Sequence, residues 1–218
     1  MKVIDVPTLC HILAARPRGK RTLVGVVGPP GSGKSRLAEE VAATLNSDSS
    51  ERAAVLPMDG YHYDDALLNQ LGRRQRKGAP DTFDVLGLRH MLMRLHDEAE
   101  GAIAVPVFDR DLEISRAGAR LISSTVDIVV VEGNYLLLRR SPWDVLGPLF
   151  DVTVMLEVPE ATLRERLAKR WQGYDLTPGE IHRKVEEVDL PNGRLVRSES
   201  AMADYLIRAA PRNSPAAT

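Results

Sequence analysis

The chain has 218 residues, of which 44% are hydrophobic and 27% charged, and this is the composition of an ordinary globular domain. Its formal net charge of -1 rules out a general attraction to nucleic acid or to an acidic membrane surface, and its single cysteine, Cys10, rules out an internal disulfide and a multi-cysteine zinc site. Because no apolar segment approaches the ~20 residues that span a bilayer and no apolar core of a secretory signal is visible, we expect a cytoplasmic protein.

Strand-like apolar runs and helical patterns alternate along the chain. A short helical pattern at residues 8–15 comes first, and apolar runs follow at 23–27, 53–58, 103–108, 128–131, 152–158 and 205–207. Helical patterns lie between most of these runs, at 35–45, 85–96 and 160–171. The alternation predicts one α/β domain over residues 1–218, with a doubly wound, mostly parallel sheet whose ligands lie at the carboxyl ends of the strands. The tail at about 210–218 has no apolar periodicity, and we expect it to be disordered.

The turn after the first apolar run carries the pattern G-x-x-x-x-G-K-S. Glycines allow consecutive backbone N–H groups to curl around an anion, and the N-terminus of the following helix adds positive partial charge. The lysine of this pattern can reach the β- and γ-phosphates of ATP, and the serine can bind Mg²⁺. The alternative is a plain glycine turn with a solvated lysine. The pattern predicts a nucleotide-binding loop made of Gly28, Pro29, Pro30, Gly31, Ser32, Gly33, Lys34, Ser35 and Arg36.

Two acidic residues stand where apolar runs end. Asp59 follows the run at 53–58, and a carboxylate there could accept the proton of a substrate hydroxyl that attacks the γ-phosphate. Glu132 follows the run at 128–131, and it is placed to hold Mg²⁺ through water. The alternatives are that Asp59 caps the next helix and that Glu132 is an incidental acid.

Two charged segments could face the phosphates. Arg166 and Arg170 share one face of the helix at 160–171, and an arginine fork suits phosphate; the alternative is a surface face that pairs with Glu165. The helix leads into a predicted helical lid at about 166–193, with a second helix that begins at Thr177 and a Pro-Asn-Gly break near its end. The basic loop at 73–77 is either a solvated loop or a mobile flap near phosphates.

These motifs, taken in order, resemble those of the P-loop kinases that include uridine kinase, phosphoribulokinase and bacterial pantothenate kinase. The segments that carry the resemblance run from about residue 23 to residue 207 and read "GPPGSGKS", "MDGYHYDD", "RKGAPDTFD", "VPVFDRDLEISR", "VVVEGNYLL" and "RERLAKR". The chain is most similar to small bacterial members that are nucleoside kinase-like or linked to fructose transport. It departs from the family where Phe108 replaces a tyrosine, and where the lid segment "RWQGYDLTP" differs from the arginine- and aspartate-rich lid of uridine kinases.

The resemblance implies a P-loop kinase fold with ATP and Mg²⁺ as cofactors, and a role for each matched residue. Asp59 would be the catalytic base, Lys34 and Ser35 would serve the phosphates and Mg²⁺, and Arg166 and Arg170 would clamp the transferring group. The acceptor site would be lined by Asp59, Tyr61, His62, Asp84, Asp109 and Arg116, and Ser35 and Glu132 would form the metal site.

The predicted function is transfer of the γ-phosphate to a hydroxyl of a small metabolite. Acids at Asp59, Asp84 and Asp109 suit a polyhydroxylated, uncharged acceptor such as a sugar (fructose), a nucleoside (uridine) or a pantothenate-like alcohol. Two alternatives stay open: an NTPase switch, against which the lack of an Asn-Lys-x-Asp motif counts, and a nucleotide-binding regulator without turnover. We expect a small-molecule acceptor as partner, no nucleic acid and no membrane, and a homodimer stays open.

Overall fold

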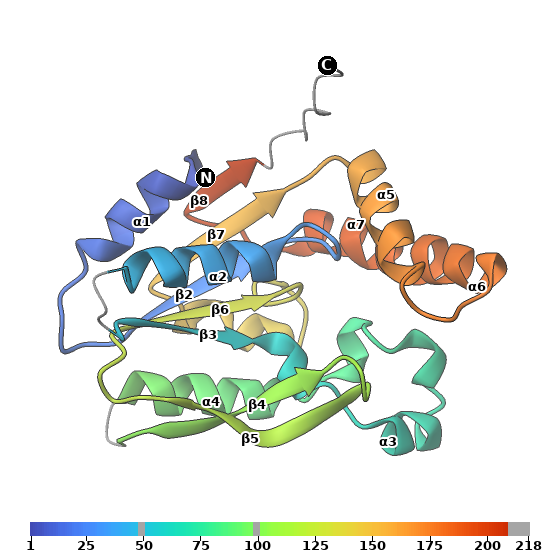
Figure 1. The fold of residues 1–218 in the computed structure, drawn as a ribbon, viewed down its shortest axis with the longest axis horizontal. Helices are drawn as coiled ribbons and strands as arrows, with labels where there is room; N and C mark the ends of the chain where they lie inside the picture. The colour runs from blue at the N-terminus through green and yellow to red at the C-terminus, as the bar shows by residue number, and fades with distance from the viewer. Residues whose placement is uncertain (48–50, 98–100, 209–218) are drawn as a thin grey trace.

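The computed structural model describes residues 1–47, 51–97 and 101–208. Its centre is a six-stranded sheet in the order β1-β8-β7-β2-β6-β3, in which every neighbouring pair is parallel. The strands are β1 (Lys2–Val3), β2 (Thr22–Val27), β3 (Ala53–Pro57), β6 (Ile128–Gly133), β7 (Val152–Glu157) and β8 (Tyr205–Arg208). The predicted α/β fold with a mostly parallel sheet is confirmed, and Figure 1 shows helices on both faces of it.

The central strands are buried on both faces, which explains their continuous apolar sequences. Side chains of β2 and β6 alternate between two cores. Leu23 and Val129 face the core that contains α4 (Val85–Asp97), whereas Val24 and Val130 face the core that contains α1 (Val6–Ala14) and α2 (Lys34–Leu45). Both faces of the sheet are therefore covered, as a parallel sheet requires.

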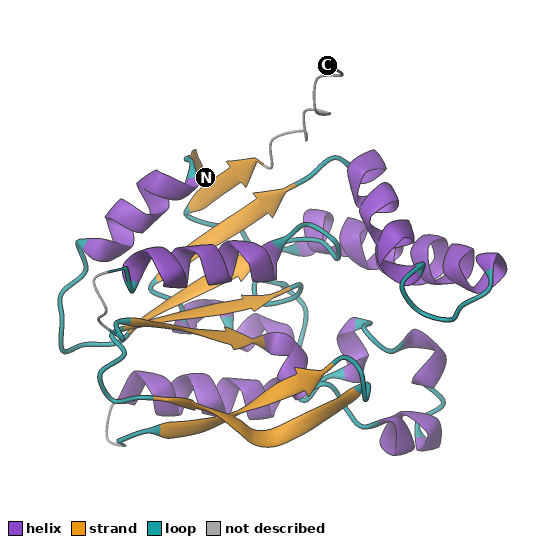
Figure 2. Ribbon diagram, in the orientation of Figure 1, coloured by secondary structure: helices purple, strands orange, loops and turns teal. Residues whose placement is uncertain are grey.

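One predicted strand lies outside this sheet. The run at 103–108 forms β4 (Ile103–Asp109), which pairs antiparallel with β5 (Ile114–Ile122) in a separate two-stranded sheet (Figure 2). We had expected this run among the strands of the doubly wound sheet, and that placement is wrong. The reason is burial: alternate residues of β4, Ile103 and Val105, are buried, whereas most of β5 is exposed. A strand with one solvated face suits a hairpin better than a central parallel sheet.

Short helices occur in the connections between the strands. They are η1 (Met58–Tyr61), α3 (Asp65–Gln70), η2 (Arg74–Arg76), η3 (Pro80–Thr82), η4 (Trp143–Val145) and η5 (Gly147–Leu149). An aromatic cluster of Phe83, Tyr135 and Trp143 holds the segment around residue 80 in place. The Tyr135 hydroxyl donates to the Gly78 carbonyl at 2.6 Å, and Trp143 Nε1 donates to the Pro80 carbonyl at 3.0 Å.

The segment predicted as a lid, at about 166–193, lies within a run of helices beyond β7: α5 (Glu160–Trp171), α6 (Pro178–Arg183), a π-helical turn η6 (Lys184–Asp189) and α7 (Leu190–Glu199). Thr177 caps α6 in a capping box with Glu180, as the sequence indicates. The expected Pro-Asn-Gly break is wrong, because Pro191 and Gly193 lie inside α7. The π-helical turn just before Pro191 changes the hydrogen-bond spacing, so the missing proline N–H does not end the helix.

In the described part of the chain, no helix has both the length and the apolar character that a membrane crossing needs.

Candidate active site

The register of the parallel strands brings the predicted motifs to one edge of the sheet. Val27 of β2 is opposite Gly133 of β6, and Glu132 of β6 is opposite Pro57 of β3. The P-loop, Glu132 and Asp59 therefore leave adjacent strands at the same carboxyl edge, beside α3 and the helices of the lid (Figure 1). A cavity of about 370 Å³ opens there between the P-loop, the lid helices and the β4–β5 hairpin.

The P-loop has the backbone shape that an anion site needs. Gly31 and Gly33 have φ values of 75° and 98°, which side chains rarely allow. Gly33 is the N-cap of α2 and no side chain caps that helix, so its first N–H groups remain available to a phosphate. A Cβ at Gly28 would lie 2.9 Å from the Leu156 carbonyl oxygen, so this position has no room for a side chain.

Lys34 begins α2 and is only 8% exposed. Its Nζ donates to the Pro29 carbonyl at 3.1 Å, which folds the side chain back over the loop. Burial lowers the pKa of Lys34, while the nearby Glu132 and Asp59 oppose that shift. The ammonium group is thus held inside the loop, within the cavity that the phosphates would enter.

Ser35 and Glu132 meet directly, although 97 positions separate them in the chain. The Ser35 hydroxyl donates to Glu132 Oε1 at 2.8 Å, and Glu132 is only 5% exposed. Burial raises the pKa of Glu132, and the charge of Asp59 adds to this rise. The pair offers two adjacent oxygen ligands of the kind that Mg²⁺ prefers. Among the described residues, no group of three or more His, Cys, Asp or Glu side chains could hold a metal ion on its own.

Asp59 lies in η1 with 25% of its side chain exposed, and it contacts Arg110, for which the sequence motifs predict no role. Arg110 Nη2 donates to Asp59 Oδ2 at 2.8 Å. Burial raises the pKa of Asp59, but the interaction with the neighbouring His62, followed by the charge of Arg110, brings that pKa below its ordinary value. Asp59 does not cap the next helix: the N-cap of α3 is Asp64, whose side chain accepts from the Ala66 N–H.

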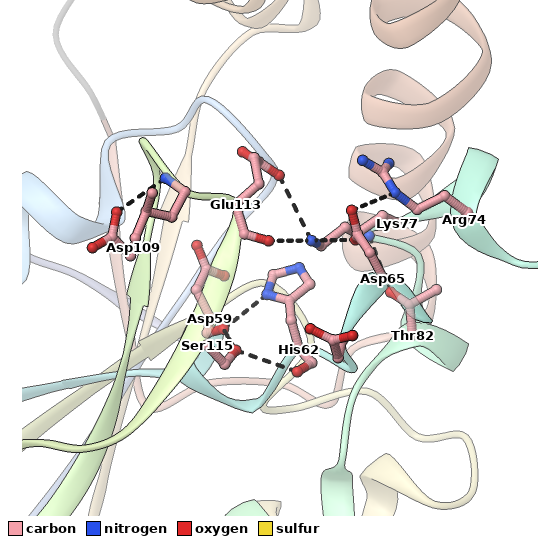
Figure 3. A network of polar contacts seen from close by, with 12 residues as sticks. Asp59, His62, Asp65, Arg74, Lys77, Thr82, Asp109, Glu113 and Ser115 are labelled. Carbon is pink, nitrogen blue, oxygen red and sulfur yellow. Dashed lines mark hydrogen bonds and ion pairs between the residues drawn. The ribbon is translucent and has the colours of Figure 1, made fainter. Parts of the chain in front are cut away.

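Both the backbone N–H and the ring of His62 contact the Asp59 carbonyl oxygen, which holds His62 beside Asp59 (Figure 3). The ring Nδ1 lies 2.8 Å from the Asp59 carbonyl oxygen, so Nδ1 carries the proton and Nε2 is left as an acceptor. The ring is packed against Phe83 and Phe108, with centroid distances of 4.0 and 4.8 Å. Burial lowers the pKa of His62, and the neighbouring Asp59 opposes this shift. The neutral ring can therefore accept a hydrogen bond from a substrate hydroxyl.

The lid arginines reach the cavity from α5. Arg166 Nη1 donates to the Ser32 carbonyl at 3.2 Å, and Arg170 stacks on Trp171 with 5.3 Å between guanidinium carbon and ring centroid. Both line the cavity with Trp171. The surface ion pairs of this helix instead involve Arg164, which contacts Glu160 and Glu186.

Two residues of the basic loop line the cavity and are neutralised by acids (Figure 3). Lys77 Nζ donates to Asp65 Oδ1 and to the Glu113 carbonyl, both at 2.7 Å, and Arg74 Nε lies 2.6 Å from Asp65 Oδ2. The loop is therefore tied to α3 and to the hairpin rather than simply solvated.

Four predicted acceptor residues lie outside the lining of the cavity. Asp84 Oδ1 accepts from the Gly87 N–H at 2.8 Å and caps α4. Asp109 accepts from two backbone N–H groups of its own turn and pairs with Arg116 at 3.4 Å. Tyr61 is buried, which raises its pKa, and its hydroxyl has no hydrogen-bond partner among the described residues.

Other residues of the cavity lining were missed by the sequence reading. They are Phe83, Arg110, Glu113, Asn134, Trp171, Lys184 and Asp189. Arg110 belongs to the segment "VPVFDRDLEISR", but its contact with Asp59 depends on how the β4–β5 hairpin folds back over η1. Trp171 Nε1 donates to Asp189 Oδ2 at 2.7 Å. This contact joins α5 to η6, and no local sequence pattern predicts it.

No family model matches the chain, but individual proteins do. The uncharacterized protein YggC of Escherichia coli K12 is 34% identical over 204 residues, which cover 91% of this chain and 84% of that protein. A candidate uridine kinase of Schizosaccharomyces pombe is 31% identical over 197 residues, which cover 87% and 83%. Pantothenate kinases are also similar, and the alignment spans about half of their length. Among solved structures, a candidate fructose transport system kinase from Silicibacter sp. TM1040 has a TM-score of 0.84 and 36% identity, with 93% of this chain and 98% of that chain covered.

Proposed function

The chain belongs to the family of P-loop kinases that includes uridine kinase, phosphoribulokinase and pantothenate kinase, and we propose that it transfers the γ-phosphate of ATP to a hydroxyl group of a small metabolite. The observation that carries the proposal is the shared cavity: Asp59 and Lys34 line it from two adjacent loops, with Arg166 and Arg170 on its lid side. A base, a phosphate cradle and a phosphate clamp are the parts that phosphoryl transfer requires.

Each group has one proposed task. The backbone of the P-loop and Lys34 bind the β- and γ-phosphates, and the arginine forks of Arg166 and Arg170 bind the transferring phosphoryl group. Asp59 accepts the proton of the attacking hydroxyl, and Nε2 of His62 helps to orient that hydroxyl. Trp171 and the lid helices restrict water around the γ-phosphate, which protects it from hydrolysis.

The residues present also fit Mg²⁺. Ser35 and Glu132 supply two neighbouring oxygen atoms, and Mg²⁺ in kinases is usually held by one or two such groups together with phosphate oxygens and water. When bound, the ion would neutralise charge on the β- and γ-phosphates.

A second cavity supports a place for the nucleoside of ATP. It has a volume of about 1030 Å³ and shares Gly31, Gly33 and Arg36 with the P-loop. Its other wall comes from the N-terminal residues, Val3 and Thr8 among them, and from Ile207 of β8. The adenine and ribose would lie here, on the opposite side of the P-loop from Asp59.

The test is acceptor-dependent release of ADP. Purified protein, ATP and Mg²⁺ are incubated with a panel of sugars, nucleosides and hydroxy acids, and ADP is measured against a reaction without acceptor. A kinase releases ADP faster with its acceptor. Slow release that no acceptor changes would instead support an NTPase switch, and tight ATP binding without release would support a regulator.

The same proposal includes a cytoplasmic location and no nucleic-acid or membrane partner, and it leaves both a monomer and a homodimer open. Sedimentation of the purified protein over a range of concentrations would distinguish the monomer from the homodimer.

A further inference from the structure

Arg110 is the first residue after β4, and it lines the cavity from the hairpin side. Its side chain is 44% exposed, so the guanidinium can be reached from the cavity. Among the described residues, the only carboxylate that contacts Arg110 is Asp59, at 2.8 Å. The carboxylate of Asp59, the proposed base, and the Arg110 guanidinium are therefore paired with each other in this structure.

The other cations on this side of the cavity are already paired with acids that have no task in phosphoryl transfer. Lys77 is held by Asp65 and Glu113, and Arg74 is held by the same Asp65. Lys34 of the P-loop and, on the lid side, Arg166 and Arg170 already provide three positive charges for the triphosphate. Arg110 is thus the cation whose counter-ion must be released before the reaction can proceed.

Two of the three acids predicted to suit an uncharged polyol, Asp84 and Asp109, lie outside the lining of this cavity. Asp84 caps α4, and Asp109 is engaged by backbone N–H groups of its own turn and by Arg116. The hydrogen-bond acceptors that remain on this side of the cavity are His62 Nε2, the Asn134 amide and the Glu113 carboxylate, which lies 3.8 Å from Lys77. Beside them, Arg110 offers a fork that can bind a carboxylate or a phosphate through two parallel hydrogen bonds.

We propose that Arg110 binds an anionic group of the acceptor, so that the metabolite phosphorylated by this chain is a hydroxy acid or an alcohol phosphate rather than a neutral sugar or nucleoside. This inference rests on the proposed kinase function and specifies its substrate class. The shared chemistry is a hydroxyl group and a carboxylate or phosphate in one small molecule.

The exchange of partners explains how such an acceptor would be selected. When the anion of the acceptor takes over the Arg110 guanidinium, Asp59 Oδ2 is freed to face the acceptor hydroxyl. That hydroxyl oxygen then forms a bond to the γ-phosphorus, the bond from the γ-phosphorus to its bridging oxygen breaks, and the electron pair leaves with ADP. The hydroxyl proton goes to Asp59. A neutral acceptor leaves Asp59 paired with Arg110 and its base function blocked.

The first experiment compares acceptors that differ in their anion. The matched pairs are glycerate and glycerol, gluconate and glucitol, pantothenate and panthenol, and ribulose 5-phosphate and ribulose. For the pair that contains the best acceptor, we expect kcat/KM of the anionic member to exceed that of the neutral member by about tenfold or more, because a charge-assisted hydrogen bond is lost in the neutral one. Carboxylate and phosphate members separate the two sources of the anion.

The second experiment changes the arginine. With the best anionic acceptor, Arg110→Gln should raise KM for that acceptor by about tenfold or more, and Arg110→Lys should rescue part of the loss because it keeps the charge but not the fork. Affinity for a non-hydrolysable ATP analogue should stay unchanged. The matched control is Arg120→Gln, on β5 of the same hairpin, which removes an exposed hydrogen bond to the Val55 carbonyl and should change neither quantity.

The outcomes separate the two proposals. Some pairs will contain compounds that are phosphorylated. If kcat/KM is equal for the neutral and the anionic member of each of these pairs, the chain is a kinase but the inference is wrong. If Arg110→Gln weakens binding of the ATP analogue and leaves KM for the acceptor unchanged, Arg110 serves the triphosphate and the inference is also wrong. If no compound in the panel increases ADP release, the proposed function itself is contradicted.

Discussion

Lys34 is a buried cation whose charge is only partly compensated in the structure. Its burial is unfavourable for an ammonium group, and the pKa of Lys34 is lowered as a result. The Pro29 carbonyl and the charges of Glu132 and Asp59 compensate in part. A bound triphosphate would bring far more negative charge, so nucleotide binding would offset the cost of burying the Lys34 ammonium group.

We therefore predict that Lys34→Ala weakens triphosphate binding and also slows transfer, because in the proposed role Lys34 would contact both the ground-state phosphate and the charge that grows on it. Titration with a non-hydrolysable ATP analogue measures the first effect and steady-state kinetics the second. If affinity and turnover both stay at the level of the parent protein, the P-loop does not act as a phosphate cradle.

Arg166 and Arg170 differ from Lys34 because they belong to α5, in the proposed lid. Arg166 now donates to a P-loop carbonyl, and Arg170 rests on Trp171, so neither has a fixed acidic partner among the described ion pairs. We predict that Arg166→Lys and Arg170→Lys reduce kcat more than they reduce ATP affinity, since lysine keeps the charge and loses the fork. The control is Arg164→Lys, whose partners Glu160 and Glu186 lie away from the cavity. Parent-like turnover of both lid variants would make these arginines ordinary surface residues.

At the scale of elements, the contact between η1 and the hairpin positions Asp59. Ser115 of β5 donates to the His62 carbonyl at 3.2 Å, and Gly60 lies against β4. A Cβ at Gly60 would be 2.7 Å from the Pro106 carbonyl oxygen, so only glycine allows this close approach. The close packing of η1 against β4 therefore explains why a glycine follows Asp59 in this segment.

We predict that Gly60→Ala pushes the hairpin away from η1 and lowers the free energy of unfolding by about 1–3 kcal/mol, the usual cost of overpacking. Chemical denaturation measures this, and turnover should fall with it because the hairpin would carry Arg110, the proposed contact of the acceptor, away from its place in the cavity lining. The control is Gly179→Ala in α6, where a Cβ meets nothing within 4 Å. It should be neutral or slightly stabilising. Equal stability of Gly60→Ala and the parent would contradict the close packing.

The helices of the lid are joined by Glu160, which accepts from Arg194 at 2.6 Å and from Arg197 at 2.5 Å. The hydrogen bond from Arg194, followed by that from Arg197, lowers the pKa of Glu160 from its ordinary value of 4.5 to about 2. A carboxyl whose pKa is lowered by folding stabilises the protein at pH values above its unfolded pKa, and this stabilisation is lost as the pH falls towards the folded pKa.

We predict that Glu160→Gln lowers Tm at pH 7, and that the difference from the parent shrinks between pH 4.5 and about 2. Thermal unfolding over this pH series is the measurement. Glu157→Gln, which breaks the more exposed pair with Arg208, is the control and should have a smaller effect. A Tm difference that does not depend on pH would show that the carboxylate charge is not what links α5 to α7.

At the scale of the whole molecule, the features that could be predicted are those with a local cause. Gly28 to Ser35 form a continuous motif, and Asp59 and Glu132 end strands whose register follows from a parallel sheet. The contact of Arg110 with Asp59 spans 51 positions and depends on the fold of the hairpin, so sequence patterns could not reveal it. Asp84 was predicted to face the acceptor, but it caps α4, a role that its place just before a helix could have suggested.

The central claim is that Asp59 takes the proton of the acceptor hydroxyl, and Asp59→Asn tests it most directly. The measurement is kcat with the acceptor that releases most ADP, together with affinity for a non-hydrolysable ATP analogue. We predict that kcat falls by about 10²–10⁴-fold, the usual effect of base removal, while nucleotide affinity changes little. Asp64→Asn is the control and should keep the parent kcat, because Asn caps α3 as well as Asp does. A kcat for Asp59→Asn within about threefold of the parent would contradict the account.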